Sequence, residues 1–161
     1  MKLTIKNHKV GGTNQDCDWS ATLYVDGKKA ALIRDPGCGA PLDVDWAPSG
    51  GTPHDRGPVH PLVLAYIKTL PAVEVPGTDG GMIGQNLHMV VDDLITVMLA
   101  ERTIKGWCKK QIVALTPGTK QGSFSRWNMP PTSLNITRIR AGLDAKYGAG
   151  KYEIVNDRYV A

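Results

Sequence analysis

Apolar and polar residues alternate near the start of the chain, which is the pattern of half-buried β-strands. Residues 3–6 alternate in this way, and along residues 19–25 the apolar side chains fall on one face. Residues 29–34 continue the pattern after Asp26-Gly27, a dipeptide favoured in two-residue hairpins. The pattern predicts an antiparallel meander of three strands with one buried face.

Helical spacing replaces alternation in the middle of the chain. Pro61 suits the first turn of a helix that continues to Lys68, before Pro71. Asn86 suits the N-cap of a second helix over 86–105, which we expect to end at Gly106. Its apolar stripe, expected to pack across the meander, consists of Leu87, Val90, Val91, Leu94 and Met98.

A second hairpin and a last helix are predicted in the remainder. The strands are expected over 111–116 and 123–128, and Thr132 or Ser133 caps a helix that ends at Gly148. The helix carries an apolar stripe of Ile136, Ile139, Leu143 and Tyr147. A short terminal helix is expected over 151–159.

The elements together predict the α+β class. We expect an antiparallel sheet, built from the three-stranded meander and the second hairpin, packed against two main helices. Length predicts a single domain over 1–161. A long Gly- and Pro-rich loop is expected over 36–60, and a second linker over 73–81.

Composition predicts a soluble, cytoplasmic protein. The hydrophobic fraction is 42% and the charged fraction is 21%, as in ordinary globular domains. The three cysteines show no pairing pattern, which favours a reducing compartment, and the first residues lack a secretion signal. The longest apolar-rich segment, 87–100, contains two aspartates and is too short for a bilayer.

Positive charge is concentrated in the second half. Residues 1–80 carry eight Lys and Arg against nine Asp and Glu, whereas residues 81–161 carry eleven against six, a net of +5. Such a balance suits an anionic partner, namely a nucleotide, a nucleic acid or an acidic protein surface. Plain solubility explains it equally well.

The loop after the meander holds a first candidate site. Arg34 suits an anion, Asp35 suits a ribose hydroxyl or a base, and Gly37 and Gly39 let backbone amides approach a ligand. No Walker motif or Rossmann fingerprint is present. A purely structural corner is the alternative.

A basic stripe with interleaved rings holds the second candidate site. Four lysines, Lys105, Lys109, Lys110 and Lys120, lie between Arg102 and Arg126, without an acidic residue. The interleaved rings are Trp107, Phe124 and Trp127, a combination typical of single-stranded nucleic acid or nucleotide binding. Strand alternation places Phe124 and Arg126 on one side and Trp127 on the other. The alternative is a solvated edge with Trp127 in the core.

Histidines and cysteines suggest two further alternatives. His54, His60, His88 and Asp92 could serve a metal-dependent hydrolase, although no zinc-site spacing is present. Cys38 could be a nucleophile beside a loop histidine, or simply a small residue in a tight bend.

The chain resembles small uncharacterised accessory proteins of tailed bacteriophages and prophages. The resemblance rests on LTIKN at 3–7 and WSATLYVDG at 19–27 with the Gly-rich loop, and on FSRWNMP at 124–130 and AKYG at 145–148. Residues 47–61 look like an addition to this pattern. The resemblance implies a phage context, where small non-enzymatic proteins bind and block host factors; it implies no catalytic residue.

We therefore hypothesise a non-enzymatic binder without metal or cofactor, located in the host cytoplasm. It binds an anionic ligand or host partner, either a nucleotide signal or a nucleic-acid-handling complex, and sequesters or inhibits it. The loop residues and the basic stripe are expected to share a cavity, enclosed between protomers of a homo-oligomer. A direct DNA- or RNA-binding module is the first alternative and the hydrolase is the second. The expected ligand-binding residues are Arg34, Asp35, Gly37, Gly39, Trp107, Lys109, Lys110, Phe124, Arg126 and Trp127.

Overall fold

The computed structural model divides the chain into two compact units, residues 1–98 and residues 99–161. The structure describes residues 1–11, 18–37, 39–47, 57–74, 79–118, 120 and 123–159. Each unit has its own main sheet, and the described residues form one buried cluster in unit 1 and two in unit 2. The expectation of one domain over 1–161 stays a prediction, and each unit is described by itself.

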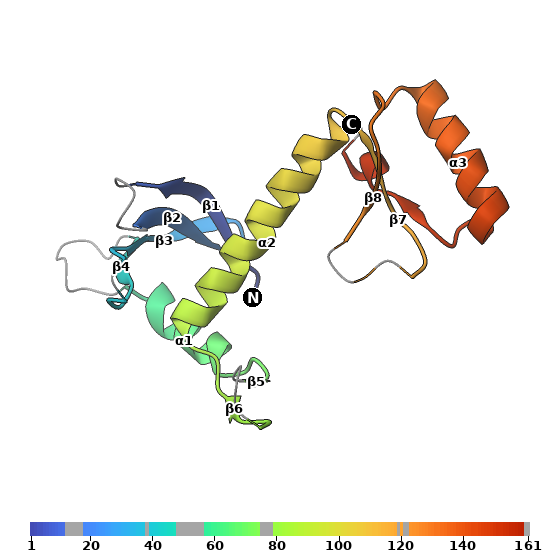
Figure 1. The fold of residues 1–161 in the computed structure, drawn as a ribbon. Coiled ribbons are helices and arrows are strands. Elements are labelled where there is room, and N and C mark those ends of the chain that lie inside the picture. The colour runs from blue at the N-terminus through green and yellow to red at the C-terminus, as the bar shows by residue number, and fades with distance from the viewer. Residues whose placement is uncertain are drawn as a thin grey trace. The chain divides into compact units, whose positions relative to one another are not determined.

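The elements confirm the α+β class (Figure 1). In chain order they are β1 (Leu3–Val10), β2 (Trp19–Val25), β3 (Lys28–Asp35), β4 (Asp43–Trp46), α1 (Val59–Ile67), β5 (Val73–Glu74), β6 (Met82–Ile83), α2 (Leu87–Cys108), β7 (Ile112–Leu115), β8 (Ser125–Trp127), α3 (Ser133–Tyr147), β9 (Glu153–Ile154) and the 3₁₀ helix η1 (Val155–Arg158).

Unit 1 is built on an antiparallel sheet in the order β1-β2-β3-β4. The predicted hairpin is confirmed, because Leu23 pairs with Ala31 and the turn residues Asp26 and Gly27 have φ of 48° and 80°. Positive φ at both central positions gives the twist that joins two strands tightly. Side chains of β2 and β3 form the buried face, and Leu23 and Ile33 are fully buried there.

The segment predicted as a loop over 36–60 contains a fourth strand. β4 pairs with β3 and buries Trp46. Its four residues do alternate between polar and apolar, but this short stretch lies among prolines and glycines that are typical of a loop, so it was not predicted as a strand. The following helix α1 begins at Val59 rather than at Pro61, and residues 48–56 lie outside the described residues. The predicted second linker over 73–81 begins with the short strand β5, which pairs with β6 directly after the linker.

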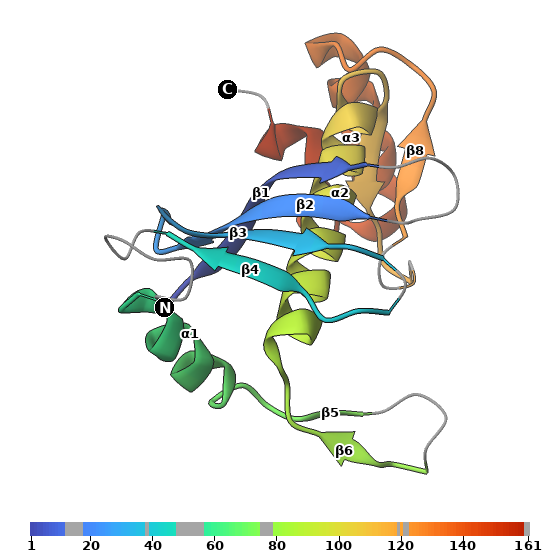
Figure 2. The same ribbon diagram turned by 90° about the vertical axis from the view of Figure 1, so that its left-hand side faces the viewer.

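Helices α1 and α2 supply the core that covers the sheet of unit 1. Val63 and Ile67 of α1 and Val91 of α2 are buried in one cluster with the strand residues. Figure 2 shows α2 running across one face of the sheet. The predicted cap is confirmed, since the Met89 N–H donates to Asn86 Oδ1 at 3.0 Å.

Helix α2 does not end at Gly106. It continues to Cys108, because Trp107 and Cys108 pack into a hydrophobic cluster of unit 2. A glycine costs a helix only about 1 kcal/mol, which such burial offsets.

Unit 2 has a separate sheet in the order β8-β7-β9, so the second hairpin does not join the meander. The short terminal helix expected over 151–159 is found as the 3₁₀ helix η1 over 155–158, and the short strand β9 precedes it. Ile154, the last residue of β9, and Val155, the first residue of η1, are both buried, and they belong to different hydrophobic clusters.

Helix α3 covers one face of this second sheet, as its apolar stripe predicts. Leu143 is buried with Ala114 and Ile154. Thr132 is the N-cap, accepting from the Asn135 N–H at 3.3 Å, and Gly148 ends the helix with φ of 89°. Both predicted caps are confirmed.

Asn156 is a buried polar residue that joins three segments of unit 2. Its side-chain oxygen accepts from the Val113 N–H at 2.7 Å. Its amide donates to the carbonyls of Cys108 at 3.0 Å and Gln111 at 2.9 Å. η1, the end of α2 and the start of β7 are thereby held together.

Replacing Asn156 with Ala is expected to destabilise unit 2 by about 2 to 4 kcal/mol, because a buried N–H and two carbonyls lose their partner. Urea unfolding followed by the indole N–H resonances of Trp107 and Trp127, the two tryptophans of unit 2, measures this. Asn128→Ala, at an exposed position of the same unit, is the control. Equal stability of the two variants would refute the role of Asn156.

Candidate functional site

An aromatic pair and an arginine form a stack on unit 2. The Arg126 guanidinium lies over the Trp107 ring, with its carbon 4.4 Å from the ring centroid. Phe124 meets Trp107 edge-on, with centroids 6.3 Å apart and planes at 70°. We call Trp107, Lys109, Lys110, Phe124 and Arg126 the basic aromatic surface.

The two rings of the stack pack on a buried hydrophobic cluster of unit 2. Trp107 comes from the last turn of α2, and it packs with Phe124 against Cys108, Val113 and Val155. Arg126 lies opposite Val113 in the β7–β8 ladder, so alternation directs it to this same face. Two segments distant in the sequence therefore hold one another's side chains in place.

Arg126 is positioned to bind an anion. Its side chain is exposed, and within the described residues it forms no ion pair with a carboxylate. The ring face of Trp107 orients the guanidinium plane without using its N–H donors. A planar fork of donors held in this way suits a phosphate or a carboxylate.

Lys109 and Lys110 follow directly on the last turn of α2. The backbone N–H groups of Lys110 and Gln111 donate to the Trp107 carbonyl at 2.9 and 2.8 Å, which closes the helix end. Both lysine side chains are exposed, and no ion pair involves either in the part of the chain that is described. Cations here also complement the negative end of the helix dipole.

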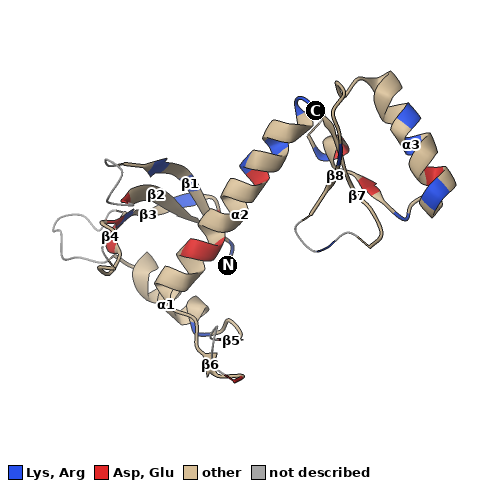
Figure 3. Ribbon diagram, viewed as in Figure 1, with Lys and Arg blue, Asp and Glu red and all other residues tan. Residues whose placement is uncertain are grey.

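The division into units sharpens the charge asymmetry. Residues 99–161 carry eleven Lys and Arg against four Asp and Glu, a net of +7, whereas residues 1–98 carry eight against eleven, a net of −3. Figure 3 shows basic residues on the second half of α2 and along α3, and Arg126 is the basic residue of β8. Unit 2 is the cationic part of the protein.

Two of the acidic residues in unit 2 are already paired. Arg158 donates to both carboxylate oxygens of Glu153, and these bonds lower the pKa of that carboxyl. Arg140 donates to Asp157 at 2.8 Å. A third carboxylate, Asp144, accepts from the Tyr152 hydroxyl at 2.8 Å. Tyr152 has a raised pKa because of desolvation and this hydrogen bond. The carboxylates of these two ion pairs do not compete for the exposed cations.

The structure adds a second cation–ring contact that the sequence analysis missed. Lys105 Nζ lies 5.9 Å from the ring centroid of Tyr159, and Tyr159 packs on the same buried cluster as Trp107. Lys105 belongs to the predicted basic stripe, but nothing in the sequence pairs it with a ring more than fifty residues later.

Trp127 lies on the opposite face of the hairpin. It packs toward α3 with Ala114, Leu143 and Ile154, whereas Phe124 and Trp107 pack on the other cluster. The predicted alternation is thus confirmed, and Trp127 does not belong to the stack with Trp107.

The corner at residues 34–37 lies in unit 1. Asp35 Oδ1 accepts from the Gly37 N–H at 2.8 Å, so this amide is already used within the chain. Gly37 and Gly39 have φ of 76° and 72°, a conformation that glycine adopts without strain. This geometry accounts for Asp35 and both glycines as parts of a tight bend.

A recess of about 470 Å³ adjoins this corner. Arg34 and Lys9 line it together with Asp18, Asp35 and Asp43, so acidic residues outnumber basic ones. Such a lining does not favour an anion. Arg34, Asp35, Gly37 and Gly39 belong to unit 1 and the basic aromatic surface to unit 2, and the expected shared cavity stays a prediction.

The candidate metal ligands form separate pairs. His88 Nε2 lies 3.4 Å from Asp92 Oδ2, one turn apart on α2, and the His60 ring meets the Trp46 ring edge-on at 5.0 Å. No group of three His, Cys, Asp or Glu side chains suited to a metal occurs among the described residues. His54 and Cys38 lie outside them.

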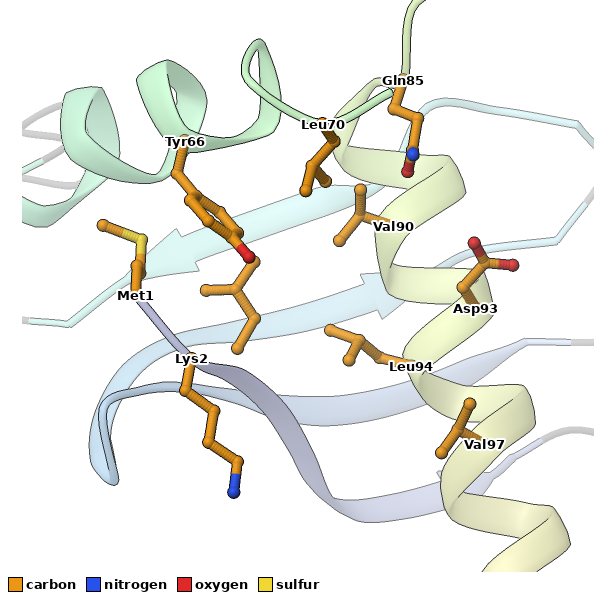
Figure 4. A pocket seen from close by; sticks show the side chains of 10 residues that line it. Met1, Lys2, Tyr66, Leu70, Gln85, Val90, Asp93, Leu94 and Val97 are labelled. Carbon is orange, nitrogen blue, oxygen red and sulfur yellow. The ribbon is translucent and has the colours of Figure 1, made fainter. Parts of the chain in front are cut away.

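Unit 1 also has an apolar groove of about 420 Å³ beside α1 and α2. Figure 4 shows Tyr66 of α1 and Leu94 of α2 pointing toward one another across it. Lys2 and Asp93 are its two charged lining residues, and they are of opposite sign. The groove therefore lacks the concentration of cations that an anionic ligand requires.

Comparison with models of protein families, with curated proteins and with solved structures finds no match to this chain. Within the ranges described above, no helix has both the length and the apolar character needed to cross a membrane.

Cys108, beneath the basic aromatic surface, is expected to react slowly. Burial raises the pKa of its thiol, an effect that nearby Arg158 partly opposes. In a Cys17→Ser/Cys38→Ser variant, alkylation by iodoacetamide near pH 8 should be at least about tenfold slower in the folded protein than in urea. Equal rates would show that Cys108 is accessible.

Proposed function

We propose that this protein is a non-enzymatic, phage-type accessory protein that binds a phosphate-bearing ligand on unit 2. The ligand is a nucleotide signal or the nucleic acid of a host complex, and binding sequesters or inhibits it. One observation carries the proposal: the exposed Arg126 guanidinium is stacked on Trp107, beside Phe124, on a unit with a net charge of +7.

The chemistry of these groups favours a phosphate joined to a planar ring. Arg126, Lys109 and Lys110 provide charge-assisted donors for phosphate oxygens. Trp107 and Phe124 provide half-buried aromatic surface beside those donors. Aromatic rings stack on bases of any identity, so this combination selects for nucleotides over simple anions.

A direct DNA- or RNA-binding module is the second candidate. It is favoured by the exposed cations that extend beyond the stack, at Lys105 and Lys120, because a phosphate backbone engages many separated charges at once. A mononucleotide contacts only the cations near the stack, namely Arg126, Lys109 and Lys110. The two candidates therefore differ in how affinity depends on ligand length.

The double substitution Lys109→Gln/Lys110→Gln is expected to weaken nucleotide or oligonucleotide binding about tenfold, because two phosphate contacts are lost. Isothermal titration with mononucleotides and with single-stranded oligonucleotides measures this. Lys151→Gln, at another exposed lysine of unit 2, is the matched control. Unchanged affinity in a folded double variant would remove the two lysines from the binding surface.

Salt dependence separates the candidates. If Arg126, Lys109 and Lys110 each contact a phosphate of single-stranded nucleic acid, log K should fall with log salt with a slope of about −2. Arg126→Ala should make this slope less negative by about 0.7, because one phosphate contact is lost. Arg126→Lys should retain the slope, because the charge remains, but it should lower the affinity, because lysine does not stack on Trp107 as arginine does. Oligonucleotide binding that ignores salt would exclude the nucleic-acid module.

A further inference from the structure

Unit 2 contains a recess of about 400 Å³ on the face of the β7–β8 hairpin that carries Trp127. Strand residues and α3 enclose it. Its lining residues are Thr116, Ser125, Trp127, Arg138, Ile139, Gly142, Leu143, Lys146 and Tyr147. The recess is distinct from the basic aromatic surface, which shares none of these residues.

The charged residues that line this recess are all basic. Arg138 and Lys146 are its charged lining residues, both are exposed, and both are basic. They lie eight positions apart on one helix, so about 12 Å of helix axis separates them, with Gly142 midway. Neither forms an ion pair in the part of unit 2 that the structure describes.

The walls are aromatic and apolar, with one polar edge. Trp127 and Tyr147 contribute rings, and Ile139 and Leu143 contribute aliphatic surface. At the strand side, Thr116 Oγ1 and Ser125 Oγ lie 3.0 Å apart, as a hydrogen-bonded hydroxyl pair. A recess of this kind suits a ligand with a flat apolar body and an anionic group.

Gly142 is one of the α3 residues that line the recess. A Cβ built at this position meets no atom within 4 Å. A larger side chain here therefore has open space to enter beside the recess, which makes Gly142 a suitable position for a blocking substitution.

We infer that this recess binds a small aromatic anion, such as an aryl phosphate, with its ring between Trp127 and the α3 face and its anionic group at Arg138 or Lys146. The volume lies at the lower end for small-molecule sites, so one or two fused rings fit and a dinucleotide does not. The site stands independently of the basic aromatic surface, on the other face of the same hairpin.

Direct binding to the full chain tests the site with three probes. 1-Naphthyl phosphate carries both ring and charge, 1-naphthalenemethanol carries the ring alone, and inorganic phosphate carries the charge alone. We expect 1-naphthyl phosphate to shift the indole N–H resonance of Trp127 at a concentration at least about tenfold lower than either of the others. A shift at Trp107 would report binding at the basic aromatic surface instead, and no shift at Trp127 at millimolar 1-naphthyl phosphate would overturn the inference.

Substitutions on α3 locate the probe. Gly142→Leu fills the recess and should weaken 1-naphthyl phosphate binding at least about tenfold. Ala141→Leu, at an exposed position that does not line the recess, should leave it unchanged. Retained binding in Gly142→Leu, or equal loss in Ala141→Leu, would refute the assignment.

A charge variant keeps the inference falsifiable if Gly142→Leu fails to fold. Arg138→Gln/Lys146→Gln should weaken 1-naphthyl phosphate about tenfold while leaving 1-naphthalenemethanol unaffected. Arg126→Ala should leave the shift of Trp127 by 1-naphthyl phosphate intact, whatever it does to a shift at Trp107, so failure of the basic aromatic surface and failure of this recess can be told apart. Undiminished binding of 1-naphthyl phosphate in the double variant would overturn the role of the two cations.

Discussion

The hydrogen bonds of Asn156 are the constraint on which unit 2 depends. One side chain joins the backbone of Cys108, Gln111 and Val113 to the 3₁₀ helix near the end of the chain. These bonds are buried, so breaking them leaves polar groups without water to replace the lost partner. They tie the last residue of α2 and the start of β7 to η1. Trp107, in the last turn of α2, and Lys109 and Lys110, between the helix and β7, lie in the segment that is held in this way.

A second constraint, strand alternation, divides the chemistry of unit 2 between two faces. Along β8, Arg126 lies over the cluster of Val113 and Val155, while Ser125 and Trp127 face α3. Three successive residues thereby contribute to two different surfaces. Both surfaces carry exposed cations beside aromatic rings, because unit 2 holds an excess of seven positive charges. The same hairpin supports the proposed phosphate-binding surface and the proposed recess.

Much of the fold could be predicted wherever local signals are strong. The Asp26-Gly27 turn, the Asn86 and Thr132 caps and the stripe of α3 each depend on a few neighbouring residues, and each is found as predicted. β4 was not predicted although its four residues alternate, because the surrounding prolines and glycines indicate a loop. β9 could not be predicted, because a strand of two residues carries no pattern and is held by pairing with β7, about forty residues earlier. The end of α2 was misplaced for a related reason, since packing of Cys108 outweighs the glycine before it.

The sequence alone determined the α+β class, the basic second half and the separation of Trp127 from Arg126, since all three follow from residue types and their local periodicity. Only the tertiary structure decided that Arg126 stacks on Trp107, that Asp35 uses the Gly37 amide, and that Gly142 faces open space. These outcomes depend on which surfaces approach one another after folding. A side chain's neighbours across a core or a recess come from distant segments, and no local pattern records them.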